Sequence, residues 1–300
     1  MYSFRMASHP SLRELPSNRA VKLNNANCPY CGVLVKTVES DEDHAIGKNF
    51  VPRGKLDGQW NLILRACRKC NAEKGELEDD LSAISMQPDA FGRYAVDDKD
   101  LVEQALRKRR SISSRTHKPV GNSVEKISFG TRVFPGSEFH FKMIGPPQAS
   151  AERAYGLARF QISAFFYWVT FDPPSRMGRF WPGQFLPVVG SARSDWGNSL
   201  MRGFMNTVNT WWTRVWGITG GGFFKVAIRR CPDQNCWSWA LEWNRNFRLA
   251  GFCGDQAAAN SIIANFEIPK MRALEGPDGE IIRYREEIEL SDNEDKMFVA

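Results

Sequence analysis

Four cysteines form two Cys-x-x-Cys pairs, Cys28–Cys31 and Cys67–Cys70, with 35 residues between the pairs. Each such turn directs two thiolates to one point, and two turns complete the tetrahedron that Zn²⁺ prefers. Disulfides are the weaker interpretation, because no secretory signal precedes the pairs and the other three cysteines are scattered. We therefore expect Cys28, Cys31, Cys67 and Cys70 to hold one structural zinc ion.

An acid, a histidine and two asparagines accompany the cysteine pairs. Asp43 and His44 are adjacent, Asn61 lies ahead of the second pair, and Asn71 directly follows it. A zinc ion closed by four thiolates has no open position for activating water, so these residues suggest a second kind of site. Carboxylate and amide oxygens suit a hard ion such as Mg²⁺. A neutral histidine beside such an ion can accept a proton from water near pH 7.

This order of residues resembles the HNH endonucleases, also called ββα-metal or His-Me finger nucleases, in their zinc-bearing branch. The resemblance covers about residues 25–80 and includes the closing Cys-x-x-Cys-Asn-x-x-Lys-Gly run. It implies that His44 is the general base, and that Asn61 holds the loop carrying His44. It also implies that Asp43 and Asn71 bind a catalytic Mg²⁺ or Mn²⁺. Many members have histidine where this chain has Asn71, and an amide oxygen favours these hard ions over softer metals.

A plain zinc ribbon is the main alternative. It would bind nucleic acid or protein without cutting, but it needs only the cysteines and leaves the other four residues unexplained. The sequence thus predicts a metal-dependent HNH endonuclease that hydrolyses DNA phosphodiester bonds, in restriction or anti-phage defence. The alternatives left open are a nuclease effector switched on by a small nucleotide and a non-catalytic zinc-ribbon nucleic-acid-binding protein.

The charge distribution favours a polyanionic partner, which we expect to be DNA. The formal net charge is +6, and residues 131–275 carry 16 basic against 9 acidic side chains. A basic run also closes the helix expected near residue 105; it suits either phosphate binding or a solvated helix end. The candidate phosphate contacts are Lys74, Arg65, Arg68, Arg107, Lys108, Arg109 and Arg110.

Nothing in the sequence predicts a membrane protein. No stretch is long and apolar enough to span a bilayer, and the N-terminus lacks the pattern of a signal peptide. We therefore expect a cytoplasmic protein with no membrane partner, whereas a homodimer stays open.

The element pattern predicts an α+β protein, with a small zinc-stapled ββα-metal nuclease module and a larger α+β C-terminal domain. The expected divisions are 1–24 as lead-in, 25–80 as the HNH nuclease module, 81–125 as helix and basic linker, 126–275 as targeting or sensing domain, and 276–300 as hairpin and acidic tail.

Several elements follow from periodicity and from helix-start residues. In the first half we expect a strand over Val33–Val38, a helix from Asn71, and a helix beginning at Asp97 and Asp98. In the second half we expect strands over 131–134, 138–143, 223–230, 236–243 and 247–253, helices over 151–170, 195–216 and 256–266, and a hairpin over 272–289 around Gly276–Gly279.

The C-terminal half holds nine of the ten tryptophans. Trp237 and Trp239 share one strand face, which favours a place in the core, although aromatics beside arginines also suit base stacking or a pocket for a single base. The sequence leaves open whether this half reads a DNA sequence, a modified base or a small nucleotide ligand. The tail, with 8 acidic against 3 basic residues in 276–300, is expected to be solvated.

Overall fold

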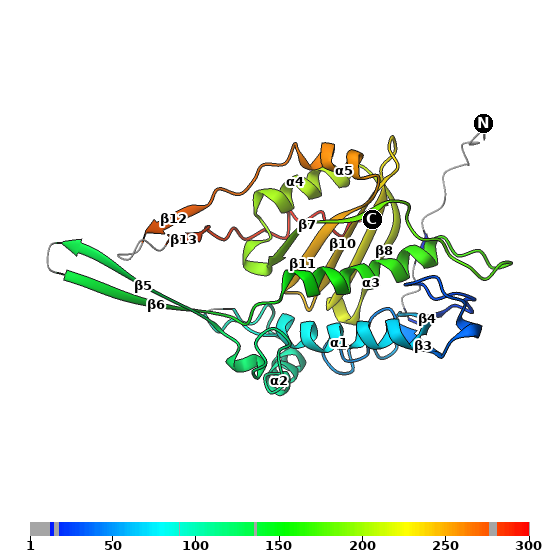
Figure 1. The fold of residues 1–300 in the computed structure, drawn as a ribbon, viewed down its shortest axis with the longest axis horizontal. Helices are drawn as coiled ribbons and strands as arrows, with labels where there is room; N and C mark the ends of the chain where they lie inside the picture. Colours follow the sequence, from blue (N-terminus) through cyan, green and yellow to red (C-terminus); the bar gives the residue numbers. More distant parts are fainter. Residues whose placement is uncertain (1–12, 15–17, 90, 135–136, 276–280, 300) are drawn as a thin grey trace.

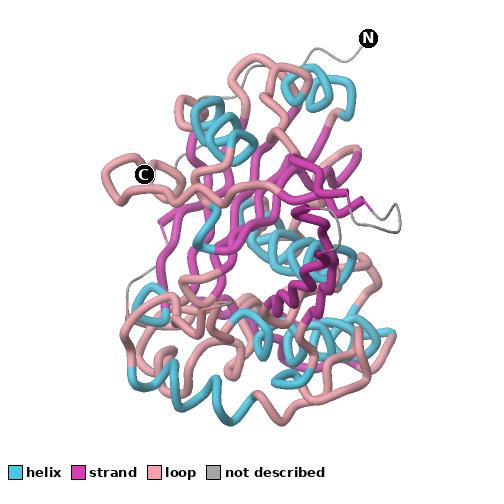
Figure 2. Tube along the Cα trace, turned by 90° about the vertical axis from the view of Figure 1, so that its left-hand side faces the viewer, coloured by secondary structure: helices cyan, strands magenta, loops and turns pink. Residues whose placement is uncertain are grey.

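The computed structural model describes residues 13–14, 18–89, 91–134, 137–275 and 281–299. Helices and strands are mixed along the described chain, which confirms the α+β class. The strands form one large sheet, one three-stranded sheet and two hairpins. Helices lie on both sides of the large sheet (Figure 1, Figure 2).

Strands β3 and β4 and the first long helix follow one another as a ββα unit, and the short β2 adds a third strand to its sheet. Strand β4 is central, with β3 antiparallel on one side and β2 parallel on the other. Helix α1 follows β4 directly, without an intervening loop. The bounds are Val21–Lys22 for β2, Ser40–His44 for β3, Leu62–Cys67 for β4 and Arg68–Ser85 for α1.

Two local predictions in this unit are wrong in detail. Val33–Val38 is not a strand, because Val35–Thr37 forms a 3-10 turn, η1, closed by the bond from Thr37 N to Leu34 O. The strand is Ser40–His44 instead, although its residues have low β propensity; pairing with β4 decides its conformation. The helix expected from Asn71 begins earlier, at Arg68.

Helix α2 spans Lys99–Lys108 and begins as predicted. The Asp98 side chain accepts hydrogen bonds from the backbone N–H groups of Asp100 and Leu101, which is a standard N-cap. A short 3-10 turn, η2, follows at Val120–Asn122.

The large sheet has the strand order β1-β8-β9-β10-β11-β7. All neighbours are antiparallel except the short β1, which runs parallel to β8. The bounds are Arg13–Glu14 for β1, Gln184–Ala192 for β7, Trp212–Thr219 for β8, Phe224–Arg230 for β9, Cys236–Trp243 for β10 and Phe247–Gly254 for β11.

The single helix predicted over 195–216 is only partly present. Arg193–Asp195 forms a 3-10 turn, η3, and α4 covers Ser199–Val208 with Asn198 as its N-cap. The chain then enters β8 at Trp212. Aromatic and β-branched residues dominate this last part, and pairing with β9 outweighs the helical spacing.

The central strand β10 shows how the sheet separates two cores. All of its residues are buried. Because side chains alternate across a strand, Trp239 and Trp243 pack with α3, Ala151–Val169, while Cys236 and Ala240 pack beneath α4 and α5, Gln256–Ile263. Trp237 belongs to the same core as Trp239, as their shared strand face favoured.

The first core also contains the ββα unit. Phe50 and Trp60 belong to the same cluster as Trp243, and the Phe50 and Trp243 rings meet edge to face at 5.4 Å. The Trp60 indole N–H donates to Ile218 O at 2.7 Å. The expected division near residue 125 is therefore not a boundary of the hydrophobic core.

Two hairpins and the C-terminal segment complete the fold. Strands β5, Glu125–Phe134, and β6, Ser137–Gly145, form a ribbon that extends away from the body (Figure 1). Strands β12, Arg272–Glu275, and β13, Ile281–Tyr284, pair as predicted, but the expected turn Gly276–Gly279 lies outside the described residues.

The acidic tail is not simply solvated, contrary to expectation. Met297 and Phe298 are buried in the core beneath α4 and α5. The Arg229 guanidinium donates to Met297 O and Val299 O, each at 2.9 Å, which anchors the tail to the sheet.

None of the described helices has the length and apolarity of a membrane span.

Candidate active site and metal centre

The four predicted cysteines meet at one point. The Sγ atoms of Cys28, Cys31, Cys67 and Cys70 all lie within 4.8 Å of one another. A tetrahedron with zinc–sulfur bonds of about 2.3 Å has sulfur–sulfur edges of roughly 3.8 Å. The Cys31 and Cys67 sulfurs are 3.7 Å apart, so this donor set fits a structural ion such as zinc.

The backbone explains how each pair reaches this geometry. In the first pair the chain turns sharply after Cys31, where Gly32 has φ +79°, and Gly32 N donates to Cys28 O. In the second pair Cys67 ends β4 and is the N-cap residue of α1, while Cys70 lies in the first turn of that helix. The metal centre therefore joins the start of α1 to the segment before β3.

Asp43 lies inside a buried polar cluster beside this centre. Its Oδ1 accepts from Lys74 Nζ at 3.1 Å, and its Oδ2 accepts from the Tyr30 hydroxyl. Lys74 Nζ also donates to His44 O at 2.7 Å and to Glu78 Oε1 at 2.9 Å. The cluster thus connects the first cysteine turn, strand β3 and helix α1.

Burial and the neighbouring charges together set the protonation states of Lys74 and Tyr30. Burial alone would lower the pKa of Lys74, but Glu78 and Asp43 outweigh it and raise that pKa, so the amine is charged. Burial raises the pKa of Tyr30 well above its usual value, and Asp43 adds to this effect. The phenol therefore stays protonated and donates to the carboxylate.

Asn61 bonds to the loop after His44. Its amide donates to Ile46 O at 2.7 Å and accepts from Ile46 N at 3.3 Å and from Leu62 N at 2.8 Å. The next residue of the loop, Gly47, donates from its backbone N–H to Glu78 Oε1 at 2.9 Å. The chain just beyond His44 is thus held by both β4 and α1.

His44 is half-buried at the end of β3. Burial lowers the pKa of its imidazole, Lys48 lowers it further, and Asp43 opposes these effects. Within the described part of the chain, the ring nitrogens have no hydrogen-bond partner. The imidazole is therefore neutral at pH 7 and available to accept a proton.

Asn71 lies on α1, one helical turn before Lys74. Residues three apart on a helix are neighbours on its surface, but no hydrogen bond joins the Asn71 side chain to Asp43 or His44 in the described part of the chain. A carboxylate has about four lone-pair directions, so Asp43 keeps acceptor capacity beyond its two hydrogen bonds. In this structure Asp43 is buried, and its two oxygens already accept from the Tyr30 hydroxyl and from Lys74 Nζ.

Three predicted phosphate contacts are already engaged within the protein. Lys74 is buried, with 1% exposure, and serves the internal cluster, so the expectation that it contacts phosphate does not match its position. Arg65 donates to Ser40 O at 3.0 Å. Arg68 pairs with Glu39 and Asp41 on the edge of β3 but stays largely exposed.

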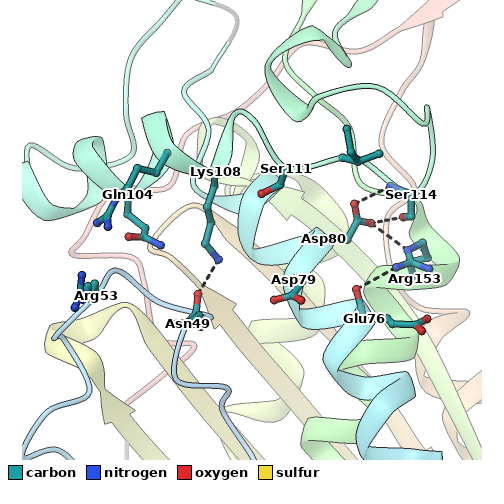
Figure 3. Close-up of a pocket in the computed structure, with 12 residues that line it drawn as sticks. Asn49, Arg53, Glu76, Asp79, Asp80, Gln104, Lys108, Ser111, Ser114 and Arg153 are labelled. Atoms are coloured by element: carbon teal, nitrogen blue, oxygen red, sulfur yellow. Dashed lines mark hydrogen bonds and ion pairs between the residues drawn. The ribbon is translucent and has the colours of Figure 1, made fainter.

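The basic run ends α2 beside a polar recess (Figure 3). Lys108 is turned inward and donates to Asn49 O at 2.7 Å, and burial lowers its pKa to about 8. Arg107 also lines the recess, whereas Arg109 and Arg110 are exposed at the end of the helix. In Figure 3, Arg153 meets Asp80, with Nε 3.0 Å from Oδ2, so part of the positive charge is neutralised locally.

The sequence did not predict two residues of the buried cluster, Tyr30 and Glu78, or the exposed Lys48 that lowers the pKa of His44. Tyr30 stands between the first two cysteines, where its ring faces inward and meets Phe160 at 5.0 Å. Glu78 is four residues after Lys74, a spacing that indicates an ion pair on one helix face. Lys48 is exposed and has no comparable signal in the sequence.

Comparison with known proteins identifies no relative. The chain matches no protein-family model, and no curated protein or solved structure is significantly similar to it.

Proposed function

We propose that this protein is a metal-dependent endonuclease of the HNH type that hydrolyses DNA. The observation that supports this best is the order of elements and residues in the ββα unit. Asp43 and His44 end the first strand, Asn61 fastens the loop, and Asn71 lies in the first part of the helix. The four-cysteine centre joins the base of the same unit.

In this proposal each residue of the candidate site has one role in phosphodiester hydrolysis. His44 accepts the proton of the water that attacks phosphorus, because its imidazole is neutral and its nitrogens are free of hydrogen bonds in the described structure. Asp43 and Asn71 would hold a divalent ion, which supplies positive charge for the developing phosphorane. Tyr30 and Lys74 orient the Asp43 carboxylate.

The test is cleavage of supercoiled plasmid by zinc-loaded protein, with Mg²⁺, Mn²⁺ or neither. We expect cleavage only with a divalent ion. His44→Ala should lower the cleavage rate by about 10²–10⁴-fold. The zinc content and melting temperature of His44→Ala should match those of the parent, because the His44 side chain makes no hydrogen bond within the described chain.

His117→Asn is the matched control, because His117 is exposed in a turn at φ +54°, a conformation that asparagine tolerates. This control should cut at the parent rate. If His44→Ala also does, the general base is misassigned. A zinc-loaded parent that binds DNA but never cleaves it would favour the non-catalytic zinc protein.

A second candidate is a nuclease switched on by a small nucleotide. The observation that favours it is the β10–β11 turn, which holds the C-terminal end of α1. Asn244 donates to Ser85 Oγ at 2.8 Å, and Asn246 donates to Ser85 O at 3.0 Å. A ligand bound near this turn would therefore meet the helix that carries Asn71. Cleavage that appears only after a nucleotide is added would support this candidate.

A further inference from the structure

A cavity of about 650 Å³ lies where the ββα unit meets the large sheet. Its wall combines the end of α1, the loop after it, the start of α3, the end of β7 and the chain beyond β13. Cavities of this size hold small molecules, and they concentrate at such junctions. None of the residues proposed for catalysis contributes to this wall.

Aromatic rings converge over a glycine in this cavity. A Cβ built on Gly190 would lie 3.3 Å from the Tyr155 hydroxyl and 3.7 Å from Phe247 Cζ. Phe247 is half-buried and lies alongside Trp243, with 27° between the ring planes and 6.2 Å between centroids. The same Cβ would lie only 2.9 Å from Leu249 Cδ2, so Gly190 allows these side chains to pack closely against the strand. Tyr155, Phe247 and Leu249 therefore form an apolar part of the cavity wall.

Two polar groups that line this cavity have unused hydrogen-bonding capacity. Within the described chain the Tyr155 hydroxyl has no hydrogen-bond partner. The Asn246 amide nitrogen donates to Ser85 O at 3.0 Å and to Gln87 O at 3.3 Å. These bonds fix the orientation of the amide and leave its Oδ1 as an acceptor.

The charged wall residues do not form a polyphosphate site. Arg93 pairs with Asp89 at 2.9 Å, and Arg285 pairs with Asp195. Two further acids, Glu287 and Glu289, line the cavity without a basic partner in the described structure. Arg193 also lines the cavity, but its guanidinium lies over the Trp196 ring. The wall thus carries four acidic and three basic side chains. A ligand with several negative charges would therefore be repelled more than attracted.

We propose that this cavity binds one nucleobase, stacked against Phe247 and hydrogen-bonded along its edge by Tyr155 and Asn246. Stacking on aromatic rings is how proteins hold unpaired bases. The acceptor Oδ1 of Asn246 favours bases that carry an exocyclic amine, namely adenine, cytosine and guanine. The choice of a nucleobase among planar heterocycles rests on the proposed action on nucleic acid.

Two sources of such a base are distinguishable in one binding experiment. The full-length, zinc-loaded protein is titrated without Mg²⁺ or Mn²⁺, so that cleavage does not affect the result. One arm uses nucleosides and their mono- and triphosphates, followed by calorimetry. The other uses DNA duplexes with one unpaired adenosine or cytidine, compared with fully paired duplexes.

We expect adenosine or cytidine to bind more tightly than thymidine, and the triphosphate no more tightly than the nucleoside. Tyr155→Phe should weaken binding by about 2- to 12-fold, which corresponds to one hydrogen bond. Phe247→Leu should weaken it by roughly 5- to 100-fold through lost stacking. Trp212→Leu is the control, since Trp212 is 37% exposed on β8 and lies outside the cavity wall.

Binding of free nucleosides identifies a soluble ligand, and a preference confined to unpaired DNA bases identifies an extruded base. The proposal is overturned if the protein binds neither free nucleosides nor unpaired DNA bases. It is also overturned if Tyr155→Phe binds as tightly as the parent while keeping the parent melting temperature. Because no cleavage is measured, an inactive nuclease with an occupied cavity would refute only the proposed function. A cleaving enzyme with an empty cavity would refute only this inference.

Discussion

At the residue scale, Lys74 is a buried charged group beside the candidate active site. Its side chain is 1% exposed and lies between Asp43 at 3.1 Å and Glu78 at 2.9 Å. Burying three charged groups is expensive, and removing one member of such a set leaves the others uncompensated. Lys74 therefore holds strand β3 to helix α1 instead of meeting a DNA phosphate.

We predict that Lys74→Met lowers the free energy of unfolding by about 3–5 kcal/mol, because two buried carboxylates lose their counter-charge. Urea denaturation of the zinc-loaded protein measures this loss. Lys69→Met is the matched control, since Lys69 is on the same helix but exposed, and it should change stability by less than about 0.5 kcal/mol. Equal stability of the two variants would contradict the structural role of Lys74.

At the element scale, helix α1 is fastened at both of its ends. Its first turn carries Cys70 of the metal centre, and its last residue, Ser85, is held by the β10–β11 turn. Asn61 and Gly47 add further bonds between the loop after β3 and its neighbours. The position of Asn71 relative to Asp43 thus depends on attachments at both ends of one helix.

We predict one zinc per chain and a local response to its removal by a chelator. The two cysteine turns should lose hydrogen-exchange protection, because the ion supplies much of their folding energy. Strands β10 and β11 should stay protected, since they are buried on both faces in cores that do not contain the four cysteines of the metal centre. Folded protein without zinc, or exchange that rises equally in all strands, would contradict this prediction.

We also predict that Asn244→Ala lowers the free energy of unfolding by about 1–3 kcal/mol. Its amide donates to Ser85 Oγ at 2.8 Å and to Phe50 O at 3.1 Å, and both acceptors would lose a buried partner. Asn244 also has φ +51°, which alanine tolerates poorly and glycine tolerates well. Asn244→Gly should therefore cost less than Asn244→Ala in thermal denaturation, and the reverse order would refute the backbone part of this argument.

At the scale of the whole molecule, the ββα unit and the large sheet share one hydrophobic core. Phe50, Trp60 and Leu62 belong to the same cluster as α3 and the tryptophans of β10. The tail also contributes, because Phe298 is buried beneath the opposite face of the sheet. The hydrophobic core therefore continues across the predicted division near residue 125.

This shared core leads to a prediction for a chain that ends at residue 125. Such a fragment would expose Phe50 and Trp60 and would lose the bond from Trp60 to Ile218. We expect it to be aggregated or to unfold without a cooperative transition, as measured by circular dichroism and size exclusion. A soluble, cooperatively folding fragment that binds zinc and nicks plasmid would restore the two-domain interpretation.

The candidate site could be predicted from the sequence wherever chemistry depends on residue type and local spacing. Two Cys-x-x-Cys turns predict their meeting point because four thiolates on one ion need that spacing, and the cysteines do converge. Asp98 predicts the start of α2 because capping involves neighbours along the chain. The face shared by Trp237 and Trp239 follows from the two-residue period of a strand.

Tertiary structure alone decided the features that depend on contacts between distant residues. Ser40–His44 became a strand through pairing with β4 despite low propensity, and 212–216 became a strand through pairing with β9 despite helical spacing. The inward place of Lys74 depends on Asp43, 31 residues away in sequence. The single core depends on contacts such as that of Trp60 with Ile218, 158 residues apart. No periodic pattern encodes such contacts, because they form only when separate elements pack together.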